Sequence, residues 1–459
     1  MKKLIYGISF LFILILIGAC FSPWRGEENG NLSIVWGNTE NSPRLVHDLA
    51  EPTEYRVILK GPDGKQKEYD FDGVPGASFS VAPGTWNVTV KGGMKVTPPP
   101  GGGYYGFDLD IIGMSQIEVS AGEKTTEFID MYNAVEVWNW EDLDFYIYNN
   151  YGNCSDCDIA QHEIIYILKS EDLLGEFEVS RTINIFNPVI IVADSDITLI
   201  RENSGRQFIE QFFQVSGNDA RLTLGSPGMN GKITIDGYLS DLGSGLEPFP
   251  TKEAIFVENN STLIMNEGVS IIENYTHYDD LWEYRYNGGG VYVNSATFTM
   301  NGGTISGNQA GYGGAVYVSG NYGFAKGVFN MAGGTISGNE ALNGDGGGVG
   351  VDVGEFNMTG GTISGNIATN GGGVYIYGSS DNSKFTKTGN SIIYGSDAPE
   401  KLQNTAFNTF YNEPGLGHAV YMRSNSSVAG GEIPTRIRNT TAGAGVDLDI
   451  KTDSGWEIN

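Results

Sequence analysis

Acidic, basic and imidazole side chains that could act together on a glycosidic bond occur in three places along the chain. Asp279 and Asp280 are adjacent, His418 follows a glycine, and Arg436 and Arg438 lie two residues apart. A glycoside hydrolase needs one carboxyl group as acid and a second as base or nucleophile, and a lyase needs a base beside several acids. Asp280 and His418 are separated by about four repeats of the kind described below. We therefore expect them not to converge, and we predict no catalytic residues.

Two cysteines form a second group with chemical potential. Cys154 and Cys157 are the only thiols beyond the first twenty residues, and such a Cys-x-x-Cys pair outside the cytoplasm could close a small disulfide loop. Asp158 and His162 lie nearby, but a zinc site needs a second matched pair of ligands, which the sequence lacks. We expect no metal and no cofactor.

The N-terminus has the features of an export signal. Two lysines precede a short apolar run that ends in Ile17-Gly-Ala-Cys20, as is typical of a secretory signal, and the run is shorter than the ~20 residues that a spanning helix needs. The final residues resemble a bacterial lipobox, which implies removal of residues 1–19, diacylation of Cys20 and a tether over residues 20–30. An ordinary signal peptide or a single anchor helix is the alternative.

The chain is strongly acidic. Its formal net charge is −28, and the acids are spread over the whole length. This balance argues against nucleic acid or another polyanion as a partner. Phe21, which follows Cys20, carries no acidic retention signal, so we expect an exported protein, lipid-anchored at the outer membrane or cell surface. The expected partners are the membrane and either a glycan or a protein of a host or neighbouring cell.

Three near-copies of one phrase indicate which elements would position any site. Met300 to Asn308, Met331 to Asn339 and Met358 to Asn366 all read Met-x-Gly-Gly-Thr-Ile-Ser-Gly-Asn. Each copy is followed by a glycine pair and a short apolar strand. Self-similarity at this spacing is typical of stacked coils, in which each coil buries its apolar face against its neighbours.

Positions that recur in the phrase are expected to stack in columns. Isoleucines and phenylalanines would fill the core, glycine pairs would permit tight corners, and asparagines would satisfy buried amides at a turn. The residues are Ile305, Ile336 and Ile363; Phe298, Phe329 and Phe356; Asn274, Asn308, Asn339 and Asn366; and Gly313, Gly314, Gly346, Gly347, Gly371 and Gly372.

The repeat resembles that of a known class of adhesins. Ile305-Ser-Gly-Asn308 followed by Gly313-Gly-Ala-Val316 is similar to the repeats of polymorphic membrane protein adhesins and, more broadly, to pectate-lyase-like β-helices. The resemblance is good over residues 261–377 and loose from Val135. It departs where isoleucine replaces phenylalanine in the first half-motif, and we expect no C-terminal membrane barrel. It implies an all-β, right-handed parallel β-helix, a fold that also hosts lyases and hydrolases.

Two domains are expected in the mature chain. Short alternating strands between residues 31 and 131 predict a small β-sandwich, whose Ala82-Pro-Gly-Thr-Trp86 phrase resembles carboxypeptidase-regulatory-like and Ig-like modules, which mostly act as spacers. Residues 132–459 are predicted to form the β-helix, with a helical cap at its N-terminal end and a closing cap at its C-terminal end. Residues 135–143 and 159–168 are the helical candidates.

The longest insertion between repeat strands runs from Tyr275 to Asn287 and combines aromatic rings with carboxylates. Sugars and protein partners both use such surfaces, and rings folded onto the flank of the coil are the alternative. We predict an adhesin-like, ligand-binding surface lipoprotein without turnover; a polysaccharide lyase or glycoside hydrolase is the alternative. The candidate ligand residues are Tyr275, Tyr278, Trp282, Tyr284 and Tyr286.

Overall fold

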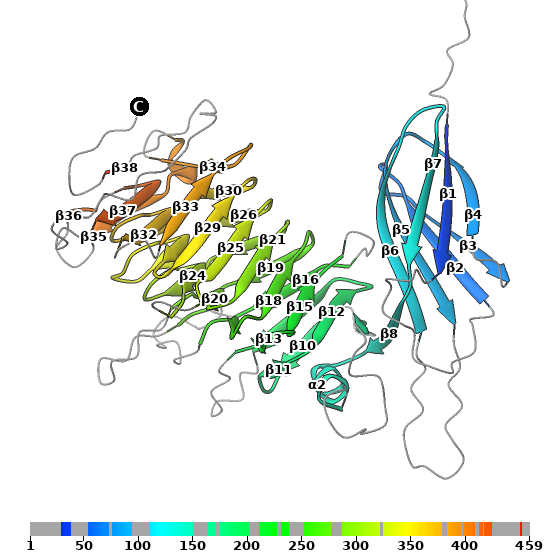
Figure 1. The fold of residues 1–459 in the computed structure, drawn as a ribbon, viewed down its shortest axis with the longest axis horizontal. Coiled ribbons are helices and arrows are strands. Elements are labelled where there is room, and N and C mark those ends of the chain that lie inside the picture. Colours follow the sequence, from blue (N-terminus) through cyan, green and yellow to red (C-terminus); the bar gives the residue numbers. More distant parts are fainter. Residues whose placement is uncertain are drawn as a thin grey trace, which may run out of the picture. The chain divides into compact units, whose positions relative to one another are not determined.

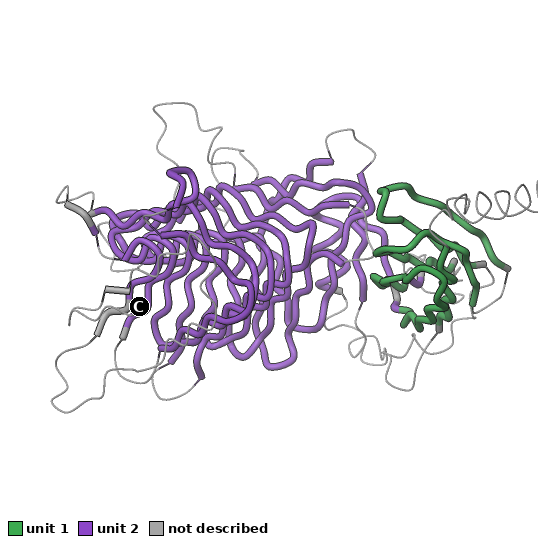
Figure 2. The backbone as a smooth tube through the Cα atoms, turned by 90° about the horizontal axis from the view of Figure 1, so that it is seen from above, with its two compact units in different colours: residues 1–42, 52–93, 113–131 green, residues 43–51, 94–112, 132–459 purple. Residues whose placement is uncertain are grey.

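The structure is a computed structural model of residues 1–459. The chain divides into two compact units: unit 1 comprises residues 1–42, 52–93 and 113–131, and unit 2 comprises residues 43–51, 94–112 and 132–459 (Figure 2). The described residues are 29–37, 54–72, 76–93, 110–149, 164–170, 175–201, 211–226, 231–237, 252–276, 287–321, 325–378, 383–395, 398–408, 413–415, 417–424 and 450–451.

Unit 1 contains two small sheets (Figure 1). The first has the order β4-β1-β7, in which β1 pairs antiparallel with β4 and parallel with β7. The second has the order β3-β2-β5-β6, and β2 pairs antiparallel with β3 and β5. The strands are β1 (Gly30–Gly37), β2 (Glu54–Lys60), β3 (Gln66–Asp72), β4 (Gly76–Val81), β5 (Gly84–Gly93), β6 (Asp110–Val119), of which residues 113–119 belong to unit 1, and β7 (Lys124–Asp130).

The core of unit 1 lies between these sheets. Alternate residues of β1, Leu32, Ile34 and Trp36, are buried, as expected for strands with one face on a core. The Trp36 ring lies 5.5 Å from that of Tyr55 on β2 and 5.9 Å from that of Phe71 on β3. Side chains of the two sheets therefore meet face to face, as in the predicted β-sandwich.

Unit 2 is a parallel β-helix with three long sheets (Figure 1). Sheet 1 contains β8 (Tyr132–Val137), β9 (Ile164–Leu168), β12 (Pro188–Ala193), β15 (Arg221–Leu224), β18 (Thr262–Met265), β21 (Thr297–Met300), β25 (Gly327–Met331), β29 (Gly354–Met358) and β33 (Lys384–Lys387). Sheet 2 contains β10 (Glu176–Val179), β13 (Ile197–Arg201), β16 (Ile233–Asp236), β19 (Val269–Ile272), β22 (Thr304–Ser306), β26 (Thr335–Ser337), β30 (Thr362–Ser364) and β34 (Ile392–Ile393).

Sheet 3 closes each coil, and a short sheet 4 lines the corner between sheets 2 and 3. Sheet 3 contains β11 (Ile183–Ile185), β14 (Phe213–Ser216), β17 (Ile255–Glu258), β20 (Val291–Asn294), β24 (Val316–Ser319), β28 (Val349–Val351), β32 (Val374–Gly378), β37 (Val420–Ser424) and β38 (Ile450–Lys451). Sheet 4 contains β23 (Gln309–Ala310), β27 (Glu340–Ala341), β31 (Ile367–Ala368), β35 (Thr405–Asn408) and β36 (Glu413–Pro414). We number the coils in chain order, so that β9, β10 and β11 form coil 1 and β33, β34 and β37 form coil 8.

Identical side chains stack through the core of unit 2. Ile305, Ile336 and Ile363 pair in register and are buried. The rings of Phe298 and Phe329 stack with centroids 4.8 Å apart, and Phe329 and Phe356 repeat that distance. This spacing is that of neighbouring strands. The predicted all-β fold with a parallel β-helix is therefore confirmed.

Glycine is required at the corner before each sheet 3 strand. Gly313 has a φ of +62°, and a Cβ atom there would lie 2.4 Å from the Val316 carbonyl oxygen. A Cβ on Gly314 would lie 2.5 Å from the carbonyl oxygen of Gly347 in the next coil. The same corner recurs at Gly346 and Gly371, which also have positive φ. Only glycine permits this backbone and this close approach.

A helix packs on the first coil. In α2 (Trp140–Asn149), the Asn139 Oδ1 caps the start by accepting the Asp142 N–H at 2.8 Å. Trp140 is buried, and its Nε1 donates to the Arg181 carbonyl at 2.9 Å. Its ring lies 5.2 Å from that of Phe213 in coil 2. The helix thus covers apolar side chains at the open end of the coil, as a cap requires.

Both helical ranges need correction. The first helix was predicted over residues 135–143, but residues 132–137 form β8. The helix begins only at Trp140, after the capping residue Asn139. The second candidate, residues 159–168, is wrong for its described part: residues 164–168 form β9, and all five are buried. A short apolar run rich in isoleucine suits a strand covered on both faces, and periodicity alone cannot separate that from a buried helix.

A buried charge ends one inward column. Met300, Met331 and Met358 pair in register, and Lys387 follows in coil 8 with 3% exposure. Burial lowers the pKa of Lys387. An inward charge at an edge opposes further strand addition.

Among the described residues, no helix has both the length and the apolar character to span a membrane.

Candidate functional site

A column of asparagines runs along the corner between sheets 2 and 3. The backbone N–H and the Nδ2 of Asn308 both donate to the Asn339 Oδ1 at 3.0 Å. The same two donors of Asn339 reach the Asn366 Oδ1 at 3.0 and 2.9 Å. Nδ2 of Asn339 also donates to the Ile305 carbonyl at 3.0 Å. All members are fully buried: Asn274, Asn308, Asn339, Asn366 and Asn404. The column holds the corner together and is closed to a ligand.

Arg201 stands at the head of this column. It is 7% exposed, its Nη2 donates to the Lys252 carbonyl at 2.9 Å, and the same atom lies 3.5 Å from the Asn274 Oδ1. Its guanidinium carbon lies 4.8 Å from the centroid of the Phe212 ring. Burial lowers the pKa of Arg201 to about 10, so the side chain remains a cation at neutral pH.

A buried carboxyl group lies in the same region of the coil. Gln211 Nε2 donates to Glu253 Oε1 at 3.1 Å, and both residues are buried. Burial raises the pKa of Glu253, while the hydrogen bond from Gln211 and the charge of Arg201 act in the opposite direction. The corner connections of coils 2, 3 and 4 are long here, and residues 202–210, 238–251 and 277–286 within them lie outside the described residues.

The outward face of sheet 3 carries a row of aromatic rings on coils 3, 4 and 5. Phe256, Tyr292 and Tyr317 pair in register and are half-buried. The centroids of Phe256 and Tyr292 are 5.1 Å apart, and those of Tyr292 and Tyr317 are 5.6 Å apart. We call these three residues the outer aromatic column. They were not singled out from sequence, although an aromatic residue between two valines, as at Val291-Tyr-Val293, points away from the core by strand alternation.

Neighbouring rings and polar groups surround the middle ring. Tyr292 lies between Phe256 and Tyr317, and polar interactions with Ser319 in the next coil and Asn287 in its own coil act on its phenol. Burial is the main reason that the pKa of Tyr292 is raised, and these two interactions oppose the rise. The phenol therefore stays neutral at physiological pH.

The outer aromatic column has a defined end. Gly350 occupies the next register position in coil 6, and a Cβ atom there would lie 3.0 Å from Tyr317 Cδ2. The absence of a side chain thus leaves room for the Tyr317 ring. Beyond it, Tyr375 and Tyr421 continue the register but are only 5% and 4% exposed. Gln214 precedes Phe256 at the other end. Among the described residues, accessible rings at this register position therefore belong to three successive coils.

Polar side chains flank the rings two residues further along each strand. Gln214 Nε2 donates to Glu258 Oε1 at 2.9 Å. The Asn294 side chain is half-buried and makes no hydrogen bond with a described residue. Its amide offers both a donor and an acceptor beside Tyr292. The arrangement can hold a flat, hydroxylated molecule by ring contacts and hydrogen bonds.

Most of the predicted ligand insertion lies outside the described residues. Tyr275 is half-buried and forms an isolated bridge with Gln309. The other four aromatic residues, Tyr278, Trp282, Tyr284 and Tyr286, lie outside the described residues. So do Cys20, Cys154 and Cys157. The lipid anchor, the disulfide and this part of the ligand site stay predictions.

His418 is the one described member of the group considered for catalysis. It lies in coil 8, where its Nδ1 accepts the Ala406 N–H at 3.3 Å. The insertion that carries Asp279 and Asp280 leaves coil 4 after Thr276. At ~4.8 Å per coil, four coils correspond to about 19 Å. Asp279, Asp280, Arg436 and Arg438 themselves lie outside the described residues.

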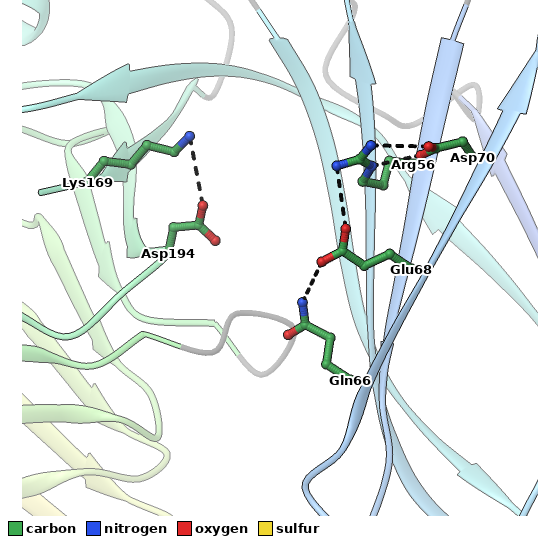
Figure 3. Close-up of polar contacts among 6 residues, drawn as sticks. All are labelled: Arg56, Gln66, Glu68, Asp70, Lys169 and Asp194. Carbon is green, nitrogen blue, oxygen red and sulfur yellow. Dashed lines mark hydrogen bonds and ion pairs between the residues drawn. The ribbon is translucent and has the colours of Figure 1, made fainter. Parts of the chain in front are cut away.

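Several cations of both units lie beside carboxylates (Figure 3). In unit 1, Arg56 Nε lies 2.7 Å from Asp70 Oδ1, and Arg56 Nη1 lies 3.4 Å from Glu68 Oε2. The carboxylate of Asp70 raises the pKa of Arg56, and Arg56 lowers that of Asp70. In unit 2, Lys169 Nζ lies 3.9 Å from Asp194 Oδ2. Their charges are compensated locally, so these residues do not form a basic patch for a polyanion.

The described residues contain no cluster of three or more His, Cys, Asp or Glu side chains suited to a metal ion. Comparisons with protein-family models, curated proteins and solved structures found no match to this chain. The geometry of the chain's own residues therefore has to support any functional proposal.

Proposed function

We propose that this protein is an exported lipoprotein, anchored through Cys20, that binds a glycan at the cell surface without turnover. The observation that carries the proposal is the outer aromatic column, in which three half-buried rings face outward from adjacent coils. The anchor part rests on the lipobox-like residues Ile17-Gly-Ala-Cys20.

An aromatic column suits a sugar for two reasons. The C–H groups of a sugar ring are apolar and can pack against the exposed parts of the stacked aromatic rings, while its hydroxyl groups need a polar neighbour, which the Asn294 amide supplies. The middle ring is also held between Phe256 and Tyr317, with ring centroids 5.1 and 5.6 Å away, before any ligand arrives. A preorganised site loses less entropy on binding than a mobile one.

Ring stacking also contributes to coil stability, because Phe256 and Tyr292 are nearly parallel at 29°. That role alone would not require neighbouring hydrogen-bonding groups to stay unengaged. The Asn294 amide has no partner among the described residues, and this favours a binding surface over a purely structural stack.

The enzyme alternative has weaker support at this surface. Glu258 and Asp352, which directly follows β28, are the carboxylates of the flanking positions from coil 3 to coil 6. Three coils at ~4.8 Å place their strands about 14 Å apart, whereas the two carboxyl groups of glycoside hydrolases lie roughly 5–9.5 Å apart. We therefore propose binding rather than cleavage.

A glycan array with the detergent-extracted, full-length protein tests this function. We expect retention of neutral glycans, at least tenfold weaker binding by Tyr292→Ala, and unchanged binding by Tyr375→Ala, which alters a covered ring of the same register. A reducing-sugar assay on the retained glycans should detect no cleavage, and acyl labelling of the preparation checks the anchor. Retention of proteins but of no glycan would contradict the proposal. So would cleavage of a retained glycan that is lost when one acidic residue is substituted.

A further inference from the structure

We propose that the outer aromatic column is a platform with three subsites, which takes three consecutive residues of a neutral, linear glycan running along the coil axis. This inference rests on the proposed function and adds the length, direction and charge class of the ligand. It follows from the spacing of the rings, from the two ends of the column and from the charges beside it.

The spacing determines the direction. Ring centroids follow one another at 5.1 and 5.6 Å, one ring per coil, across the strands of sheet 3. A pyranose ring is similar in width to a phenol ring, so successive sugars of an extended chain can contact successive rings only if the chain crosses the strands. A glycan lying parallel to a strand would meet one ring and then the polar residue two positions away.

The two ends determine the length. Phe256 is preceded in register by Gln214, and Tyr317 is followed by Gly350, which offers no side chain. The next ring, Tyr375, is only 5% exposed. A fourth sugar on either side therefore finds no accessible ring at the same register position among the described residues, and the contacts with the outer aromatic column stop at three.

The charges determine the class of sugar. The outward and flanking positions from coil 2 to coil 6 include the acids Glu258 and Asp352 and contain neither lysine nor arginine. An acidic surface on a chain of net charge −28 repels uronate and sulfated glycans. The Asn294 amide, by contrast, can both donate to and accept from the hydroxyl groups of the central sugar.

Titration calorimetry with oligosaccharides of increasing length tests the subsites. The probes are cello-oligosaccharides and N-acetylglucosamine oligomers of one to six units, with trigalacturonate as the anionic counterpart, added to full-length protein in detergent. In at least one neutral series, affinity should rise by about tenfold per unit up to three and then level off, as expected when each ring adds one contact. Trigalacturonate should bind at least about tenfold more weakly than the neutral trimer.

Two variants identify the subsites. Phe256→Ala should move the plateau from the trimer to the dimer and leave dimer affinity close to that of the wild type. Tyr292→Ala removes the central contact and should lower the affinity for dimer and trimer alike. Tyr375→Ala is the matched control, since it alters a covered ring of the same register. Circular dichroism and the thermal midpoint show whether each variant is folded, and Phe256→Ala keeps the test valid if Tyr292→Ala is not.

The possible binding results separate failure of the subsites from failure of the proposed function. Full affinity for a single sugar would overturn the three subsites while the glycan-binding function stands. A rise that continues to the hexamer would overturn the boundary at Gly350, and preference for trigalacturonate would overturn the neutral class. If none of the neutral or acidic glycans binds, the proposed function itself fails.

Discussion

Unit 2 builds the corner between sheets 2 and 3 in two different ways. In coils 4 to 8, identical asparagines satisfy one another, and from Asn308 onward each Oδ1 accepts from the asparagine of the preceding coil. In coils 2 and 3, the same corner contains Arg201, Gln211 and Glu253, which are buried and differ in charge. The first solution can be repeated for any number of coils. The second depends on one particular set of partners and has to bury two ionisable groups.

The largest expected effect comes from breaking the asparagine column in its middle. Asn339→Leu keeps a similar volume but leaves the N–H of Asn308 without an acceptor and the Ile305 carbonyl without a donor. Such unsatisfied buried groups should lower the free energy of unfolding by about 3–5 kcal/mol. Urea unfolding followed by circular dichroism measures it. Asn330→Leu, on the outward face of the same coil, should cost less than about 1 kcal/mol; equal losses would refute the column's role.

Removing the head of the column should cost less. Arg201→Met leaves the Asn274 Oδ1 without its cation and leaves Lys252 as the remaining positive charge that lowers the pKa of Glu253. We expect a loss of about 2–3 kcal/mol, because a buried group that loses its partner can partly compensate by protonation. The matched control is Arg221→Met on the outward face of β15, with an expected change within about 0.5 kcal/mol. Equal thermal midpoints for the two variants would show that Arg201 contributes no more to stability than the outward-facing Arg221.

The smallest effect concerns pH. Burial raises the pKa of Glu253 above its ordinary value of 4.5. The folded protein therefore binds this proton more tightly than the unfolded chain does. The resulting stabilisation is complete below the ordinary pKa, and it is lost as the pH rises through the folded-state value. Glu253→Gln cannot titrate, so the thermal midpoint of the wild type should fall relative to the variant, on the order of 2 °C, between acidic and neutral pH. Parallel pH profiles would show that Glu253 does not titrate in this range.

The repeated part of the fold was accessible from sequence because its residues occupy the same position in each copy. Ile305, Ile336 and Ile363 pair in register as expected from the phrase that contains them. Asn404 was missed, since the phrase is degenerate in coil 8 and an insertion follows Tyr394. Residues 164–168 were misassigned because an apolar run shorter than two helical turns has no distinctive period.

The outer aromatic column and the buried pair of Arg201 and Glu253 were harder to predict from the sequence. The side chains of Phe256, Tyr292 and Tyr317 point outward by strand alternation, but their mutual distance depends on the register of coils with insertions of different length. Arg201 and Glu253 are remote in sequence and belong to no motif. Only the closed coil brings them into one region, so tertiary packing rather than local pattern determines their environment.

The side-chain amides of the corner all point the same way. From Asn274 to Asn366, each Nδ2 donates to the Oδ1 of the asparagine in the next coil, so the side-chain bonds of the column all run toward its C-terminal end. Their dipoles therefore add, and each bond polarises the next, by roughly 10–30% in condensed-phase estimates. The negative end of this chain is the Asn274 oxygen, where the guanidinium of Arg201 lies. The corner thus acquires an electrical polarity like that of an α-helix, with a cation at its carbonyl end.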